Sequence, residues 1–331
     1  GLGIGADTAI FIGWNVVLLR PSPFADPDRI VMVWETDRGS GTRHEPASWP
    51  DIVDFRQRSR TLASIGTVAG QDVTIAGRNG ADPFRAAGAA VTPNLFPLLG
   101  VRPLVGRMFT ADEGQAGGQP VVMLGEGFWR SRFHADPAIV GRTITVDERP
   151  ALVAGVLPAA ADLGVKQIHD RADYAPAFGG ERVDVWLATQ PTATAYPRTT
   201  HPFLAVGRLA PGATLGSAQR ELSGIAADLE RGYAENANRG VNLEPYAAVV
   251  FGGVRPALVT LLGAVTLVLL VTCANVANLL LARTATRARE VAVRVALGAA
   301  HGRIGRQFLA ESLLFVLLGA ALGIGIAHGG L

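Results

Sequence analysis

The chain is poor in lysine and cysteine, and Lys166 and Cys273 are the single examples of each. No G-x-x-x-x-G-K-[ST] motif surrounds Lys166, so the chain has no P-loop and cannot bind ATP in that way. One cysteine cannot form an intramolecular disulfide. Any folded domain must therefore be held together by its own core.

Motifs of other enzyme classes are also missing. The histidines are scattered and include no H-E-x-x-H or comparable metal-binding spacing. No G-x-S-x-G, the nucleophile motif of many serine hydrolases, occurs. We therefore expect a non-catalytic protein with no cofactor, no metal and no nucleic-acid partner, and we regard an enzyme on a membrane anchor as the weaker alternative.

Apolar residues, in contrast, are abundant and gather in three stretches. Residues 256–282 carry no charge in 27 positions, residues 312–331 carry none in 20, and residues 1–19 carry only Asp7. About 20 mostly apolar residues cross the ~30 Å hydrocarbon core of a bilayer, and a soluble helix of that length would show a polar face. We expect three membrane-spanning helices, the first and last of them truncated by the chain ends.

The distribution of charge predicts the orientation in the membrane. Residues 283–311 contain six arginines and two glutamates, a net charge of +4, whereas residues 20–255 contain 24 basic and 25 acidic residues. Short arginine-rich loops stay in the cytoplasm, while long domains cross largely regardless of charge. We therefore expect residues 20–255 outside the cytoplasm and residues 283–311 inside it.

Residues 20–255 have the pattern of a mixed α/β domain. Ser48 is expected to cap a helix that begins near Trp49, and Thr214 to start a helix that ends near residue 233. Further helices are expected at 94–99 and 126–133, and residues 158–181 are expected to form a loop. The predicted strands are 29–35, 72–76, 84–91, 120–124, 142–147, 151–157, 203–209 and 241–246.

The order strand–helix–strand occurs in residues 29–91 and again in residues 203–250, with a β-rich stretch between them. Two such units packed side by side would form a split, ferredoxin-like layer of helices on a sheet. The predicted fold class is thus membrane α-helical with a large α+β domain.

A short amphipathic helix is predicted between the second and third spans. Arg287, Glu290 and Arg294 share one face at spacings i, i+3 and i+7, and Gly298 ends the helix. The remaining positions are mainly apolar and include Val291, Val293, Val295 and Leu297. Such a helix either lies at the lipid surface or docks into a groove of a cytoplasmic partner, and the pattern alone does not choose.

Residues 287–314 (RAREVAVRVALGAAHGRIGRQFLAESLL) resemble the cytoplasmic segment of MacB/FtsX-type ABC transporter permeases. The resemblance extends through residues 3–35, 49–62, 92–110 and 203–222. Residues 3–35 are similar in particular to the duplicated orphan permeases of acidobacteria. Ile12-Gly13-Trp14 departs from the family, in which small and β-branched residues are more usual there.

The resemblance implies a MacB-type periplasmic core domain, with one lobe at 25–90 plus 200–250 and an inserted β-rich lobe at 91–199. It also implies the bacterial cytoplasmic (inner) membrane as the location. Its spans would be residues 1–19, 256–282 and 312–331.

The resemblance further implies a set of partners and a mechanism. A separate ABC ATPase subunit would contact a coupling helix through Arg287, Glu290, Val291, Arg294, Val295 and Gly298. A second permease half or copy is expected, and a periplasmic adaptor or hydrolase is a candidate partner. Mechanotransmission would then drive export of a small molecule, peptide or lipid-linked cargo. The alternative is an FtsX-like regulatory membrane protein that activates an extracytoplasmic hydrolase or signals without transporting cargo.

Overall fold

The computed structural model describes residues 24–76, 82–174, 180–252 and 255–286. Contacts divide the chain into two units, of which one is Ser22–Gly252 and the other combines Gly1–Pro21 with Gly253–Leu331. The first unit is called the α/β domain below. Each unit is described by itself.

The α/β domain contains eleven strands and six α-helices among its described residues. The strands are β1 (Ile30–Asp37), β2 (Thr42–Glu45), β3 (Leu62–Ile75), β4 (Phe84–Val91), β5 (Val105–Gly106), β6 (Val121–Gly125), β7 (Thr143–Val146), β8 (Arg149–Leu157), β9 (Val185–Ala188), β10 (Leu204–Leu209) and β11 (Arg239–Pro245). The helices are α2 (Trp49–Arg58), α3 (Leu95–Leu99), α4 (Glu126–Phe133), α5 (Val165–Arg171), α6 (Leu215–Gly232) and α7 (Tyr246–Phe251).

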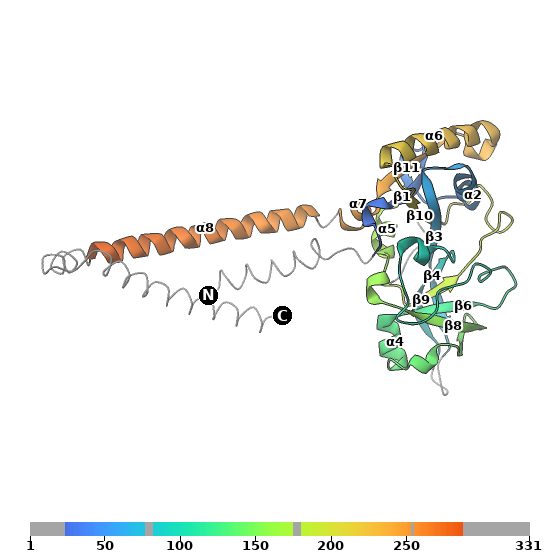
Figure 1. Ribbon diagram of the computed structural model, residues 1–331, viewed down its shortest axis with the longest axis horizontal. Coiled ribbons are helices and arrows are strands. Elements are labelled where there is room, and N and C mark those ends of the chain that lie inside the picture. Colours follow the sequence, from blue (N-terminus) through green and yellow to red (C-terminus); the bar gives the residue numbers. More distant parts are fainter. Residues whose placement is uncertain (1–23, 77–81, 175–179, 253–254, 287–331) are drawn as a thin grey trace. The chain divides into compact units, whose positions relative to one another are not determined.

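All eleven strands belong to one mixed sheet in the order β11-β1-β10-β3-β4-β9-β6-β8-β5, with β2 paired to β1 and β7 paired to β3 and β8. The pairs β4–β9 and β6–β8 are parallel, and the others are antiparallel. Figure 1 shows α2 and α6 near one end of the domain and α4 near the other.

The strands β11-β1-β10-β3 form the antiparallel order of a ferredoxin-like unit, built from β1-α2-β3 and β10-α6-β11. The helix starts have the local causes that the sequence indicates. Ser48 accepts a hydrogen bond from the backbone N–H of Asp51 at the start of α2. Thr214 and Ser217 cap the start of α6 reciprocally. Both predicted helices are thus confirmed.

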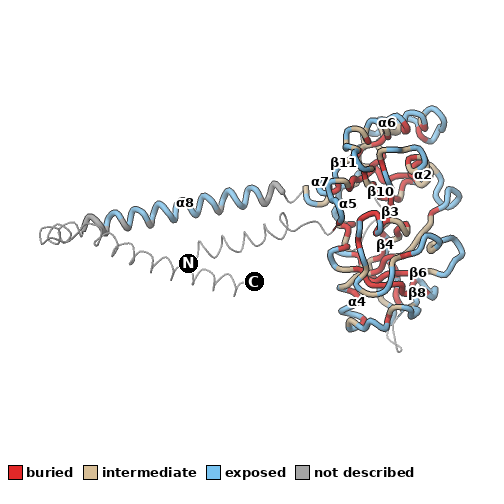
Figure 2. The backbone as a smooth tube through the Cα atoms, in the orientation of Figure 1, coloured by how far each residue is buried: buried red, intermediate tan, exposed pale blue. Residues whose placement is uncertain are grey.

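The strand β1 is buried on both faces, which explains its unbroken apolar run. Val31 and Val33 pack in the core beneath α2 and α6. Ile30, Met32 and Trp34 pack in a second core with α3, α5 and α7. Figure 2 shows buried residues concentrated along the strands of the domain. The sheet therefore has helices on both faces in this region.

A third core lies around β6, β7, β8 and α4. The turn between β7 and β8 consists of Asp147 and Glu148, both with positive φ (46° and 64°), as in two-residue hairpin turns. The carboxylate of Asp147 accepts a hydrogen bond from the N–H of Thr74 at 2.7 Å, which fastens this turn to β3. The helix α4 contributes Phe128, Trp129 and Phe133 to the core.

The structure differs from the sequence predictions at six elements of the domain. Residues 158–181 were predicted to be a loop, but α5 forms there because Val165 and Ile168 bury one side of it. The strand β3 begins ten residues before the predicted 72–76, since β10 and β4 pair with it on both sides. The short strands β2, β5 and β9 and the helix α7 were also missed.

The remaining helix, α8 (Arg255–Thr286), belongs to the second unit. The predicted spans at 1–19 and 312–331 lie outside the described residues and stay predictions. The predicted division of the domain into two lobes also stays a prediction. The sheet runs without interruption through β4 and β9, on either side of the proposed boundary.

Candidate functional site

The predicted contact residues for an ATPase lie outside the described residues, which reach Thr286 in this part of the chain. These residues are Arg287, Glu290, Val291, Arg294, Val295 and Gly298. Their role as a coupling helix remains a prediction. The functional elements that the structure does describe are α8, the two ends of the α/β domain, and a cavity at α4.

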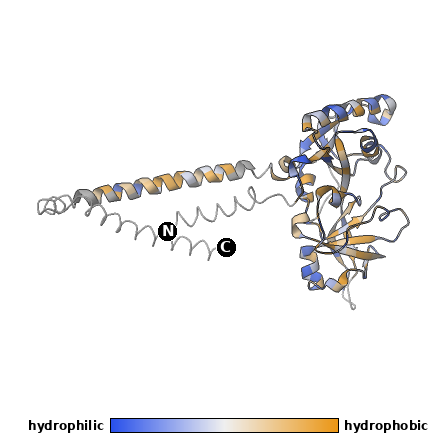
Figure 3. Ribbon diagram, viewed as in Figure 1, coloured by the Kyte–Doolittle hydropathy of each residue, from blue (hydrophilic) through white to orange (hydrophobic). Residues whose placement is uncertain are grey.

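Among the described residues, α8 alone is long and apolar enough to cross a membrane, judged by length and composition. The qualifying segment, Val259–Leu279, has 21 residues, and at 1.5 Å per residue it is about 32 Å long. Figure 3 shows hydrophobic residues along most of the helix. Leu267, Leu270 and Leu279 are 65%, 64% and 70% exposed, and an exposed apolar surface of this kind is typical of a segment that contacts lipid or another protein.

The polar side chains of α8 that bond locally are compatible with an apolar environment. The hydroxyl of Thr266 donates to the carbonyl of Leu262, and that of Thr272 donates to the carbonyl of Val268, each at 2.8 Å. Hydroxyls satisfied within the helix need no water. The best predicted span, 256–282, therefore coincides with an observed helix.

The two ends of the α/β domain meet at one place, the junction formed by Phe24, α7 and α5. The rings of Phe24 and Tyr246 pack edge to face with centroids 5.5 Å apart. The buried hydroxyl of Tyr246 donates to the carbonyl of Leu163 at 2.5 Å, and burial raises the pKa of this phenol. The chain thus enters and leaves the domain over the same core.

The helix α7 also packs directly on α5. Gly164 precedes α5 in a left-handed conformation (φ 57°), and a Cβ there would lie 2.8 Å from Cγ1 of Val250. The N–H of Gly164 donates to the carboxylate of Asp162 at 3.2 Å, whose pKa burial raises. Because α7 and α5 are in close contact here, a displacement of α7 is expected to displace α5 as well.

A polar group beside α5 ties its end to β2 and β11. The backbone N–H groups of Arg43 and His44 both donate to the carboxylate of Asp173 at 2.7 Å. The imidazole of His44 lies 3.0 Å from Glu244, which also pairs with Arg171 at 3.3 Å. The junction is therefore connected to the edge of the sheet by charged hydrogen bonds.

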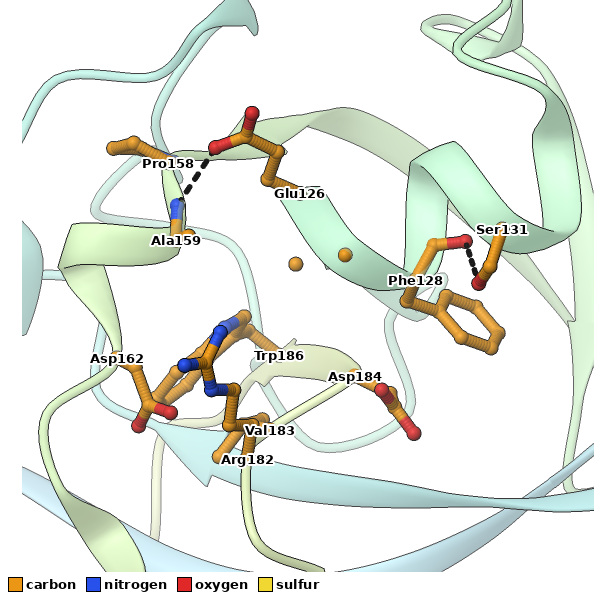
Figure 4. A pocket seen from close by; sticks show the side chains of 12 residues that line it. Glu126, Phe128, Ser131, Pro158, Ala159, Asp162, Arg182, Val183, Asp184 and Trp186 are labelled. Atoms are coloured by element: carbon orange, nitrogen blue, oxygen red, sulfur yellow. Dashed lines mark hydrogen bonds between the residues drawn. The ribbon is translucent and has the colours of Figure 1, made fainter. Parts of the chain in front are cut away.

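A cavity of about 130 Å³ opens where the start of α4 faces residues 158–162 and 182–186 (Figure 4). Glu126 accepts a hydrogen bond from the N–H of Ala159 at 3.0 Å, and this bond, together with Arg130, lowers its pKa. Burial raises the pKa of Asp162 and Asp184 on the opposite side. Sites that enclose drug-sized ligands measure ~300–1,000 Å³, so this cavity is too small to hold such a cargo.

Sequence reasoning missed both helices of the junction, and the signals for them were weak. The apolar spacing of Val165 and Ile168 is that of one helix face, but it spans a single turn. Tyr246 was placed at the end of the last strand, whereas it begins α7 after Pro245.

Within the described ranges, no group of three His, Cys, Asp or Glu side chains is arranged to hold a metal ion.

Comparison with protein-family models gives two matches that together cover nearly the whole chain. Residues 1–225 match the MacB-like periplasmic core domain. Residues 262–331 match the FtsX-like permease C-terminal family. The first match alone includes more than half of the chain.

Individual relatives agree with these matches. The macrolide export ATP-binding/permease protein MacB of Chromobacterium violaceum is 28% identical over 89% of this chain and 42% of its own length. The ABC transporter permease YknZ of Bacillus subtilis is 38% identical over 29% of this chain and 24% of its own length. The chain thus spans less than half the length of these curated relatives.

A solved structure with a similar fold is the periplasmic region of MacB from Actinobacillus actinomycetemcomitans. It has 13% identity and a TM-score of 0.47, and the match covers 71% of this chain and 95% of that one. The family assignment depends on the two family-model matches and the MacB relatives. The chain belongs to the MacB/FtsX-like family of ABC transporter permeases.

Proposed function

We propose that this chain is a non-catalytic permease subunit, or part of one, that couples ATP hydrolysis by a separate ABC ATPase to export. The cargo is a small molecule, peptide or lipid-linked compound, and the coupling is by mechanotransmission. The family membership and the absence of a P-loop in the sequence support a subunit that receives its energy from a partner.

The chain is a multi-pass protein of the bacterial cytoplasmic membrane in this proposal. Residues 1–19, 256–282 and 312–331 span the bilayer, and residues 20–255 lie outside the cytoplasm. The net charge of +4 in residues 283–311 supports this orientation. A second permease half or copy completes the membrane part, and an adaptor outside the membrane is a further candidate partner.

The observation that best supports mechanotransmission is the junction. Phe24 and Tyr246, at the two ends of the α/β domain, pack against each other. The proposed first span precedes the domain in the sequence, and the proposed second span follows it. A relative movement of those spans would act on one small area, and α7 would pass it to α5 through Val250 and Gly164.

On the cytoplasmic side, the helix at 287–298 receives the movement. Glu290 and its neighbours Arg287 and Arg294 offer charges to a groove of the ATPase, while Val291 and Val295 offer apolar contact. Two spans flank this helix in the proposal, so a shift of the helix moves both.

Val250→Ala tests this mechanism in the full-length permease with its ATPase in lipid nanodiscs. The readout is hydrogen exchange of the amides of α5 and α7 with and without ATP. The parent should show an ATP-dependent change in exchange there. Val250→Ala should lose most of that change, because alanine lacks the methyl groups that face Gly164. Val105→Ala, a half-buried valine on β5, is the matched control and should behave like the parent. An α5 unaffected by ATP in the parent would refute the mechanism.

A further inference from the structure

Two buried glutamates face each other on neighbouring strands of the α/β domain. Glu35 on β1 and Glu45 on β2 are directly opposite in the antiparallel register. They are 2% and 3% exposed, respectively. Like charges at this spacing destabilise a sheet, and burial makes two free carboxylates far more costly. Something must therefore neutralise them.

Two basic side chains, His201 and Arg239, lie close to both carboxylates. His201 places Nε2 3.2 Å from Oε2 of Glu35 and Nδ1 3.9 Å from Oε1 of Glu45. Arg239, on β11, places Nη1 2.6 Å from Oε2 of Glu45 and 3.8 Å from Oε2 of Glu35. Only the arginine is permanently charged. Two carboxylates thus share one fixed positive charge.

The other charged groups nearby already have partners of their own. Arg198 pairs with both Asp51 and Asp54 from α2. The hydroxyl of Tyr174 donates to Glu45. A cavity of about 10 Å³ beside Glu35 is lined by the apolar side chains of Phe55, Ala226 and Leu229 and by the polar side chains of Asp51, Asn236 and Arg239. The titratable and charged groups that face Glu35 are Glu45, Asp51, Tyr174, His201 and Arg239.

Within the cluster of Glu35, Glu45, His201 and Arg239, the charges balance only when one proton is added. Glu45 and Arg239 cancel, and Glu35 with neutral His201 would leave one uncompensated buried negative charge. We propose that Glu35 and His201 form a buried proton-binding pair, which holds one proton between β1 and the segment that leads into β10. Whichever partner carries the proton, the cluster is then neutral.

The pKa of Glu35 indicates that the pair loses its proton near neutral pH. Burial raises its pKa from 4.5 to about 7, and the nearby imidazole of His201 opposes that rise. The folded pKa lies above the unfolded one, so the contribution to stability is complete below pH 4.5 and is lost as pH rises through 7.

The pair supports several elements at once. Oε1 of Glu35 accepts a hydrogen bond from the N–H of Ser48, the cap of α2, at 2.8 Å. The neighbouring Ala47 is bridged to Phe203, just beyond His201. Loss of the proton therefore loosens β2 and the start of α2 together. If the domain lies outside the cytoplasm, a step that rests on the proposed function, the pair responds to the pH of the medium.

The test is urea unfolding of the purified full chain in detergent between pH 5 and pH 8. From the two pKa values, the unfolding constant of the parent should rise by on the order of 70-fold through this pair. Glu35→Gln should remove that rise. Glu235→Gln, on an exposed glutamate, is the matched control and should keep it. A Glu35→Gln chain with the pH dependence of the parent would overturn the proposal.

His201→Gln keeps the proposal testable if Glu35→Gln fails to fold. Glu35 alone must then hold the proton, so the stability step should move to higher pH, because His201 lowers the pKa of Glu35. The infrared spectrum should also show a carboxylic-acid carbonyl band that disappears above that step. Equal destabilisation at every pH, with no such band, would contradict the proposal. Neither measurement needs an ATPase or a cargo, so neither depends on the proposed function.

Discussion

Gly164→Ala is a sharp probe of the contact between α5 and α7, because the substitution has two separable costs. Gly164 has φ 57°, a left-handed conformation that a side chain disfavours by about 1 kcal/mol. Its new Cβ would lie 2.8 Å from Cγ1 of Val250. Forcing extra carbon into a packed site costs roughly 1 kcal/mol or more. The expected total is about 2 kcal/mol in the free energy of unfolding.

Gly212→Ala separates the two costs. Gly212 also has a positive φ (78°), but nothing lies within 4 Å of its Cβ position. This control should therefore lose only the backbone contribution, about 1 kcal/mol. The difference between the two alanine variants measures the packing of α7 against α5.

Urea unfolding of the full chain in detergent, with linear extrapolation, gives both values. The double variant Gly164→Ala/Val250→Ala should recover part of the loss, because the smaller residue makes room for the new methyl group. Equal losses for Gly164→Ala and Gly212→Ala, with no recovery in the double variant, would refute the close contact. The helices α7 and α5 would then not be rigidly linked within the junction.

Two further predictions concern Glu221, the residue of α6 that binds the segment before β3, and the proposed coupling helix. Burial alone would raise the pKa of Glu221, but hydrogen bonds from Thr61, Ser59 and the backbone lower it to about 2. Its contribution to stability is present above pH 4.5 and is lost as pH falls toward 2. Glu221→Gln should thus cost ~1 kcal/mol at pH 7, after allowance for solvent screening, and should remove that acid-side loss in urea unfolding. Glu290→Arg and Val291→Asp should reduce co-purification with the ATPase and its stimulation in nanodiscs, while insertion stays normal. Unchanged coupling would leave this helix as a membrane-surface element.

Elements with a local cause could be predicted from the sequence. The capped start of α6 at Thr214 and the start of α2 at Ser48 are decided by residues within three positions of each other. The hairpin of β7 and β8 is equally local. The uninterrupted apolar run of α8 needs only length and composition. Each of these agrees with the structure.

Features that depend on distant contacts could not be predicted. The short helix α5 buries only Val165 and Ile168, and it packs against α7, about 80 residues later in the chain. The proton-binding pair joins Glu35 with His201, and its neighbours Glu45 and Arg239 are equally dispersed. No spacing in the sequence indicates such a cluster, since only the folded sheet brings β1, β2 and β11 together.

The central claim, a permease whose α/β domain lies outside the cytoplasm, is tested most directly by cysteine accessibility. In a Cys273→Ala background, a cysteine at the exposed Thr194 should react with a membrane-impermeant thiol reagent in intact cells. A cysteine at Ala300 should react only after the cells are permeabilised, because the arginine-rich segment around it is expected inside. Labelling of Ala300 but not of Thr194 in intact cells would contradict the orientation and the mechanism built on it.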